Sequence, residues 1–181
     1  MIIELNPGIA KEIYQYLGIR PFYNRETAKL VKPNDYLIYI GKSFKEIESA
    51  SKFSNAIIIN PTGFDKFYKE KGLIGILKNN NSYLELPLNY LIHSGKYLSF
   101  NLNKFKQFYL EAYRKGVGII VTCKCEKDFE VKTELERKSI LVAIGFKEEE
   151  AFEIIRKKPI QFLSQNSNST ELLKELKLIK S

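Results

Sequence analysis

The sequence predicts a single α/β domain, built either as a compact or incomplete (β/α) barrel of the TIM-barrel type or as a doubly wound parallel sheet. Short apolar runs alternate with amphipathic stretches along most of the chain, which is the pattern of parallel strands joined by crossover helices. The chain has 181 residues, which is enough for one sizeable core but short for a barrel of about 250 residues. A barrel would therefore need shortened helices and tight loops.

About six apolar runs are expected to form strands. The run at 56–59 is β-branched throughout, as in a strand buried on both faces. The run at 117–123 (VGIIVTC) has the strongest strand pattern of the chain. The segment 96–102 (KYLSFNL) is ambiguous, because it alternates like a strand but leads directly into a helix. The expected strands are 2–5, 35–40, 56–59, 73–77, 83–86 and 117–123.

Helices are expected between and after these strands. Ser43 is placed to cap the helix that follows the strand at 35–40, and Gly145 is placed to end a later one. The expected helices are 9–17, 25–31, 44–53, 64–71, 88–93, 103–115, 132–144, 148–157 and 160–165. Residues 1–166 thus form one β/α domain, and 167–181 form a polar linker and a short C-terminal helix that needs a docking surface to be stable.

The composition favours a soluble protein that binds nucleic acid. The formal net charge is +8, and a diffuse positive field speeds association with a polyanion. No apolar run reaches the length of about 20 residues that spans a bilayer. The N-terminus lacks the basic start and long apolar stretch of a signal peptide. We therefore expect a cytoplasmic protein without a membrane partner.

Residues suited to catalysis are scarce. His93 is the only histidine, and its place after an apolar run is typical of a hydrogen-bonded structural histidine. The Gly41-Lys42-Ser43 sequence resembles the end of a phosphate-binding loop but lacks the upstream glycine of that motif. We expect no catalytic residue on this chain.

The cysteines Cys123 and Cys125 are the only two. A C-x-C pair in a strand could close only a strained disulfide loop, and a metal site would need more ligands. We expect free, partly buried thiols, no metal site and no cofactor on the protein.

The segment from Lys96 to Lys127 is the candidate for RNA binding. It holds seven basic residues against only Glu111 and Glu126, and several aromatic residues are interleaved with the cations. A plain amphipathic helix with a lysine-rich outer face would give the same pattern, so both interpretations stay open. The candidate RNA-binding residues are Lys96, Lys104, Lys106, Arg114, Lys115, Lys124 and Lys127.

The part of the chain from Tyr83 to about Asn166 has a distinctive order of features. They are a short strand, a polar break with a basic residue, a basic helix, a strong strand, a helix that ends in Ile-Gly, and an acidic helix start before Pro and Asn. The segments that carry them are 83–86 (YLEL), 94–96 (SGK), 112–122 (AYRKGVGIIVT), 143–151 (AIGFKEEEA), 158–159 (KP) and Asn166. In this order and spacing the segment resembles a known family, the ribonuclease P protein component 3 family, which comprises the β/α-barrel subunit shared by archaeal and eukaryotic ribonuclease P.

The resemblance implies a non-catalytic, RNA-binding subunit of an enzyme that removes the 5′ leader from precursor tRNA. The chemistry would be performed by Mg²⁺ ions bound to the catalytic RNA. The implied partners are ribonuclease P RNA, precursor tRNA, ribonuclease P protein component 2 and the other ribonuclease P proteins. Aromatic residues such as Phe64, Phe67 and Tyr68 would suit a protein-contacting face, although aromatic residues more often lie in a core.

The chain departs from the family pattern in two places. The family carries several arginines before the basic helix, where this chain has Lys96 and few others, and lysine binds phosphate as a point charge without the bidentate geometry of arginine. Cys123 and Cys125 replace a small-residue strand end. Two alternatives stay open: a small metal-independent β/α-barrel enzyme, and a protein-interaction module without RNA.

Overall fold

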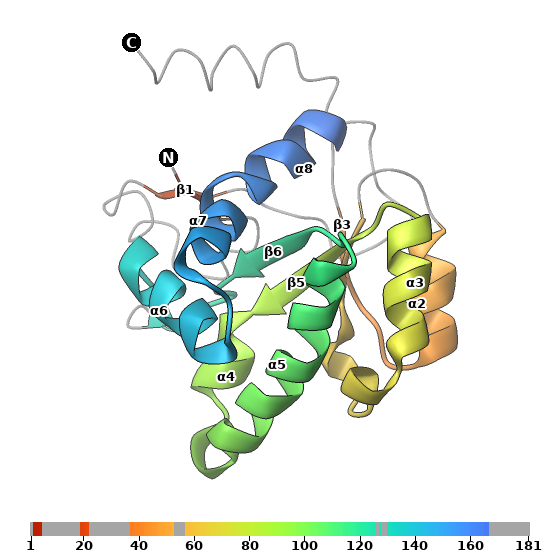
Figure 1. Cartoon of the computed structure of the whole chain (residues 1–181), viewed down its shortest axis with the longest axis horizontal. Helices are drawn as coiled ribbons and strands as arrows, with labels where there is room; N and C mark the ends of the chain where they lie inside the picture. The colour runs from red at the N-terminus through yellow and green to blue at the C-terminus, as the bar shows by residue number, and fades with distance from the viewer. Residues whose placement is uncertain are drawn as a thin grey trace.

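The computed structural model describes residues 2–4, 19–21, 37–52, 57–125, 127 and 130–166, which form short strands and a set of helices (Figure 1). The strands are β1 (Ile2–Glu4), β2 (Ile19–Pro21), β3 (Leu37–Ile40), β4 (Ile57–Asn60), β5 (Tyr83–Pro87) and β6 (Ile119–Thr122). The α-helices are α2 (Phe44–Ser51), α3 (Lys71–Asn79), α4 (Leu88–Ile92), α5 (Leu98–Arg114), α6 (Glu134–Ile144), α7 (Glu148–Arg156) and α8 (Lys158–Asn166). Three short 3₁₀ turns, η2 (Pro61–Gly63), η3 (Phe67–Lys69) and η4 (Gly95–Tyr97), connect them.

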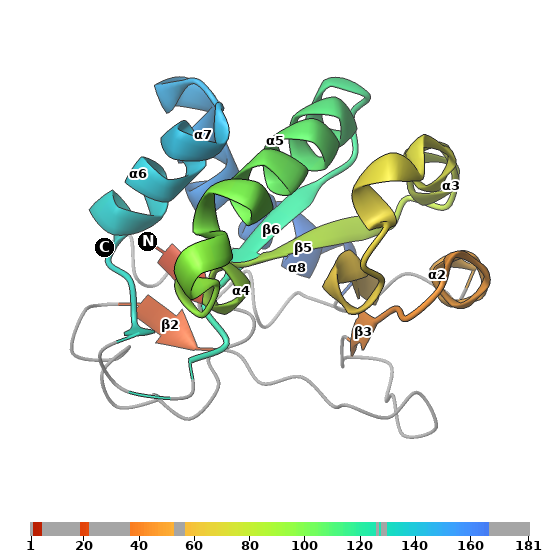
Figure 2. The same cartoon turned by 90° about the horizontal axis from the view of Figure 1, so that it is seen from below.

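The described strands form two parallel sheets. One has two strands, β1 and β2, and the other has four in the order β3-β4-β5-β6. The four strands follow one another in chain order without a reversal, so successive right-handed crossovers place their helices on the same face. Figure 2 shows α2, α3, α5, α6 and α7 side by side on that face.

This arrangement bears on the two predicted architectures. A doubly wound sheet contains a reversal of strand order and carries helices on both faces, and the four-stranded sheet has no such reversal. The wall of a (β/α) barrel has consecutive strand order with helices outside, which fits the four-stranded sheet. The sheets are not closed among the described residues, so the complete barrel stays a prediction.

The core lies between the four-stranded sheet and its helices. Leu84, Leu86, Ile119 and Val121 point from β5 and β6 toward this layer, and each is at most 3% exposed. The intervening residues of the same strands point to the opposite face, as the alternation of a strand requires. Both faces of this sheet bear buried side chains, which explains the continuous apolar runs in the sequence.

Helix α5 packs on the sheet through an aromatic stripe. Phe105, Phe108, Tyr109 and Ala112 follow the i, i+3, i+4, i+7 spacing of one helix face, and all four are buried. The Phe67 ring meets the Phe108 ring edge-on at 5.2 Å between centroids. Such edge-to-face pairs add roughly 0.5–1.5 kcal/mol each beyond the burial of their surface.

Sequence signals at the helix ends act as expected. The Ser43 hydroxyl accepts a hydrogen bond from the Glu46 backbone N–H at 3.3 Å, which caps α2. Gly145 ends α6 with a φ of 115°, a left-handed conformation that favours glycine. A Cβ at Gly41 would lie 2.1 Å from Cγ1 of Ile47, so Gly41 is required for close packing of α2 against the loop before it.

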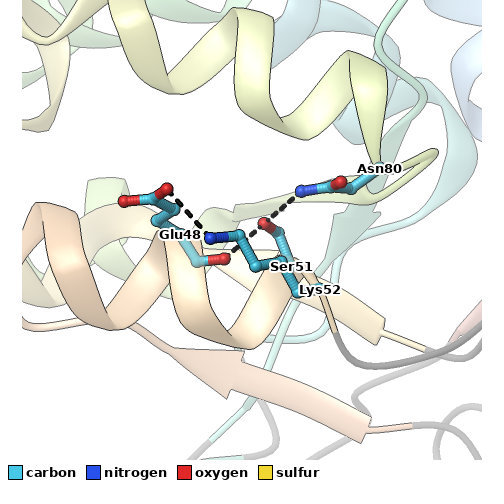
Figure 3. A network of polar contacts seen from close by, with 4 residues as sticks. All are labelled: Glu48, Ser51, Lys52 and Asn80. Carbon is cyan, nitrogen blue, oxygen red and sulfur yellow. Dashed lines mark hydrogen bonds and ion pairs between the residues drawn. The ribbon is translucent and has the colours of Figure 1, made fainter.

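Helices α2 and α3 are joined at their C-terminal ends by polar contacts (Figure 3). The Asn80 side-chain amide donates to the Ser51 hydroxyl at 2.8 Å, and that hydroxyl donates to the Glu48 carbonyl at 2.8 Å. Lys52 forms an ion pair with the Glu48 carboxylate at 3.1 Å. The two crossover helices on either side of β4 are therefore held together at the end opposite the carboxyl ends of the strands.

The structure corrects several expected elements. The run at 73–77 is helical and forms the middle of α3, so the strand prediction was wrong. The ambiguous segment 96–102 forms η4 and the first turns of α5, and the expected helix at 64–71 is only the short turn η3 followed by the start of α3. Strand β2 was not expected at all. The expected helices at 9–17 and 25–31 and the linker and helix at 167–181 lie outside the described residues.

Replacing Val121 by aspartate is expected to prevent folding. Val121 is 3% exposed in β6, and a carboxylate there would be buried without a designed partner, at a cost of at least about 3 kcal/mol. Far-UV circular dichroism and thermal unfolding measure this effect. The matched control is Val142→Asp, because Val142 lies on α6 and is 41% exposed. Equal melting temperatures for the two variants would contradict the assignment of β6 to the core.

Candidate nucleic-acid interface

A cavity of about 400 Å³ opens at the carboxyl ends of the four-stranded sheet. It is lined at the strand ends by Ile40, Asn60, Pro87 and Lys124, and beside them by residues of α4, η4 and the first turn of α5. We call this cavity the edge cleft. Ligands of parallel α/β folds bind at this end of the sheet, because the connections that leave the strands place side chains there.

The first turns of α5 extend past the sheet next to the edge cleft, and Figure 1 shows them as the lowest part of the molecule. Here Tyr97 is 58% exposed and Phe100 is 54% exposed. The Lys96 ammonium lies 5.2 Å from the centre of the Tyr97 ring, and that of Lys104 lies 4.6 Å from the centre of the Phe100 ring. Exposed aromatic rings flanked by cations are the elements of a surface that stacks bases and neutralises phosphates.

The remaining cations of α5 lie apart from this surface. Lys106 and Arg114 are exposed, and Lys106 lies beside Gly145 at the end of α6. Lys115 is 2.9 Å from the Glu111 carboxylate, which Lys71 also contacts at 3.3 Å. The hydrogen bond from Lys115 is the main reason why the pKa of Glu111 lies below its ordinary value. Lys115 is thus less available to a phosphate than the sequence indicated.

Two candidate cations follow β6. Lys124 lines the edge cleft and has a φ of 45°, a conformation that is uncommon for residues other than glycine and often marks functional positions. Lys127 is exposed, and its backbone N–H donates to the Glu130 carboxylate at 3.2 Å. The structure therefore brings Lys124 together with Tyr97 around one cavity, and it brings Lys96 and Lys104 to the exposed rings next to it.

His93 has a partner, as expected. Its Nε2 lies 2.7 Å from the Glu130 carboxylate, which is only 2% exposed. The bond joins the end of α4, where His93 lines the edge cleft, to the segment that follows β6.

A buried polar network behind the edge cleft was not expected from the sequence. Glu85 is fully buried in β5, and its carboxylate accepts hydrogen bonds from the Asn60 amide at 2.6 Å and the Thr122 hydroxyl at 2.5 Å. The Tyr109 hydroxyl donates to the Glu85 carbonyl at 2.6 Å. The only signal for this network is an acidic residue inside an apolar strand, YLELP, which also fits a half-exposed strand.

Both cysteines are buried, and neither forms a disulfide within the described part of the chain. The thiol pKa of Cys123 is raised far above its ordinary value, first by a hydrogen bond with Cys125 and then by burial. Among the described residues, no group of three His, Cys, Asp or Glu side chains could hold a metal ion. Of the aromatic residues considered for a protein-contacting face, Phe67 is fully buried, and Phe64 and Tyr68 are partly buried and pack against the core.

Similarity to known proteins is found in the structure and not in the sequence. No protein-family model matches the chain, and no curated protein matches it. The fold is similar to that of one chain in a cryo-EM structure of archaeal ribonuclease P with mature tRNA, with a TM-score of 0.67 and 13% sequence identity. The match covers 93% of this chain and 81% of that one.

The two chains share a fold. Because the sequence identity is 13%, the likeness shows the shared fold and not a shared activity. The match includes β/α units of the N-terminal half, for which the sequence resemblance from Tyr83 to Asn166 offered no support. Within the described part of the chain, moreover, no helix is both long and apolar enough to cross a membrane.

The thiols are expected to be inert in the native protein. Because the pKa of Cys123 is strongly raised, its thiol stays protonated through the neutral and mildly alkaline range, and only the thiolate is nucleophilic. We expect slow reaction with a chromogenic disulfide reagent at pH 8 and at pH 9, and rapid reaction of both thiols in denaturant. Rapid labelling of the native protein at pH 8 would contradict this, with circular dichroism as the control for intact folding.

Proposed function

We propose that the chain is an RNA-binding protein subunit of ribonuclease P, which supports removal of the 5′ leader from precursor tRNA by the catalytic RNA. The observation that carries this proposal is the fold likeness to a chain of archaeal ribonuclease P over nearly the whole chain. The sequence resemblance to ribonuclease P protein component 3 was drawn independently from the segment 83–166. The fold likeness supports a protein of ribonuclease P, and the sequence resemblance supports component 3 as its identity.

The cations of the chain support the role in RNA binding. The net charge is +8, and Lys96, Lys104 and Lys124 lie around the edge cleft and the exposed aromatic rings beside it. Phosphate contacts from such side chains position an RNA without reading its sequence. This suits a protein that holds a structured RNA in its active form.

The proposal includes further parts. The chemistry is performed by Mg²⁺ ions on the RNA, and the protein binds ribonuclease P RNA, precursor tRNA, protein component 2 and the other protein subunits in the cytoplasm. The two parallel sheets are segments of one compact or incomplete barrel, which the consecutive strand order and the one-sided helix layer support.

One observation favours a second candidate function. The His93–Glu130 pair beside the edge cleft has the geometry of a histidine oriented by a carboxylate, as in a general base. A small metal-independent enzyme would use this pair on a ligand in the cleft. The pair would then be required for activity of the chain on its own, whereas a ribonuclease P subunit requires the RNA.

Reconstitution tests the proposed function. The purified chain is added to ribonuclease P RNA with the other protein subunits, and cleavage of precursor tRNA is followed with and without it. We expect stimulated cleavage at limiting Mg²⁺ and none by the chain without RNA. The control is a Phe152→Ala variant, which is expected to stimulate as well as the wild type, because Phe152 is an exposed residue of α7 that does not line the edge cleft. Absence of stimulation together with absence of RNA binding at low salt would contradict the proposal.

Removing four cations of α5 is expected to weaken RNA binding and its salt dependence. Each lost phosphate contact lowers the slope of log K against log salt by about one. Because Lys115 is paired with Glu111, the slope is expected to fall by about three rather than four. The measurement is a titration of ribonuclease P RNA over a series of salt concentrations. The variant carries Lys104→Ala, Lys106→Ala, Arg114→Ala and Lys115→Ala.

The control removes the same charge from the neighbouring part of the helix layer. Its four lysines lie on or next to α2 and α3, and all are exposed. They are Lys42, Lys45, Lys52 and Lys78. If both variants lose the same affinity and the same salt slope, binding depends only on the total charge. The assignment of an RNA interface to α5 would then be contradicted.

A further inference from the structure

We infer that the edge cleft and the exposed Tyr97 ring form a binding site for an unpaired nucleotide of RNA. The base would stack on Tyr97 and enter the cleft, and the phosphate would lie near Lys124. This inference rests on the proposed function, because it assumes that the protein binds RNA. It adds the kind of RNA element that is bound, which neither the fold likeness nor the net charge indicates.

The size of the edge cleft suits one nucleotide. Its volume of about 400 Å³ lies within the range of about 300–1,000 Å³ of sites for small organic ligands. A double helix is far too wide to enter such a cavity. An unpaired base, in contrast, can be extruded from its neighbours and bound by stacking and by hydrogen bonds to its edges.

The ring of Tyr97 provides the stacking surface. It lines the edge cleft and is 58% exposed, so much of this side chain is accessible at the rim of the cavity. The Lys96 ammonium 5.2 Å from the ring centre adds positive charge beside it. Phe100, exposed to 54% with Lys104 at 4.6 Å, repeats the pairing of ring and cation on the next turn and can hold a second base.

The interior of the edge cleft provides groups that hydrogen-bond a base edge. Asn89 and Asn101 carry amides that both donate and accept, and Thr62 and Ser94 carry hydroxyls. Asn101 is oriented by its own bond, because its amide nitrogen donates to the Ser94 hydroxyl at 2.8 Å. Its side-chain oxygen is left to accept from a ligand. Neutral amides and hydroxyls of this kind match the edges of nucleobases.

The charge around the edge cleft selects an anionic ligand. Lys124 forms no ion pair within the described part of the chain, and none of the described residues that line the cleft is acidic. The nearby carboxylates of Glu85 and Glu130 are at most 2% exposed and bonded to protein groups. A phosphate beside Lys124 would therefore meet a cation and no carboxylate from the described residues that line the cleft. This favours RNA over a basic protein surface as the occupant.

The experiment measures binding of the full chain to a short single-stranded RNA and to the same sequence as a duplex, by fluorescence anisotropy. Tyr97→Ala is expected to weaken binding of the single strand about tenfold, which is the usual loss for one stacked base. Duplex binding is expected to change less than about twofold, since phosphate contacts dominate it. Tyr97→Phe keeps the ring and is expected to bind as the wild type does. Lys124→Ala is expected to weaken single-strand binding and to lower its salt slope by about one.

The matched control is Phe152→Ala. Phe152 is also an exposed aromatic residue paired with a cation, since it is 41% exposed with the Arg156 guanidinium 4.2 Å from its ring centre. It lies on α7, away from the edge cleft, so its replacement is expected to leave single-strand binding unchanged. Thermal unfolding of each variant shows whether the fold is intact. We expect unchanged melting temperatures, because both rings are exposed.

Cross-linking adds a direct readout. A single-stranded RNA that carries 5-iodouridine cross-links to stacked aromatic side chains on irradiation, and mass spectrometry of the digested complex identifies the residue. We expect the cross-link on Tyr97, and its loss in Tyr97→Ala.

The outcomes separate this inference from the proposed function. If the wild type binds RNA but Tyr97→Ala binds the single strand equally well and no cross-link forms on Tyr97, the nucleotide site is overturned while the proposed function stands. If Tyr97→Ala impairs only the reconstituted complex and not RNA binding, the surface contacts a protein and the inference is likewise overturned. If the wild type binds neither single-stranded RNA nor ribonuclease P RNA, both proposals fall.

Discussion

The hydrogen-bonded carboxylate of Glu85 is the constraint on which the four-stranded sheet depends. A carboxylate buried without partners costs several kcal/mol, so the strands must present donors to it. Asn60 supplies one from β4 and Thr122 another from β6. A slip of either strand by one residue would turn its donor to the opposite face. Strands β4, β5 and β6 are thereby held in a single register.

That register also determines where the edge cleft lies. Asn60 connects the network to the surface, because its side-chain oxygen accepts hydrogen bonds from the Thr62 backbone N–H and hydroxyl at 2.9 and 2.6 Å. Thr62 lines the edge cleft. The rim of the cavity is therefore connected through Asn60 to the buried side chain of Glu85 in the sheet. A site positioned in this way is preorganised, which lowers the entropic cost of binding a ligand.

Helix α5 packs against the sheet along its middle and exposes aromatic side chains at its N-terminal end. Its middle buries Phe105, Phe108 and Tyr109 against the sheet, so its orientation is set by packing. Its first turns and the preceding η4 extend past the sheet, and there Phe100 and Tyr97 stay exposed beside lysines. Exposing large aromatic rings is unfavourable unless a partner covers them. The packed middle of the helix thus holds in place an N-terminal end whose exposed rings are suited to binding a partner and contribute little to the stability of the fold.

The sequence by itself determined the β/α alternation, the caps at Ser43 and Gly145, the strand around Val121 and the basic character of α5, because these follow from local spacing and from charge. It could not distinguish helix from strand at 73–77, since a five-residue apolar run fits either. Only the tertiary structure decided that Glu85 is buried and that Lys124 and Tyr97 share one cavity. Such proximity arises from the pairing of strands far apart in the chain, and local sequence contains no signal for it.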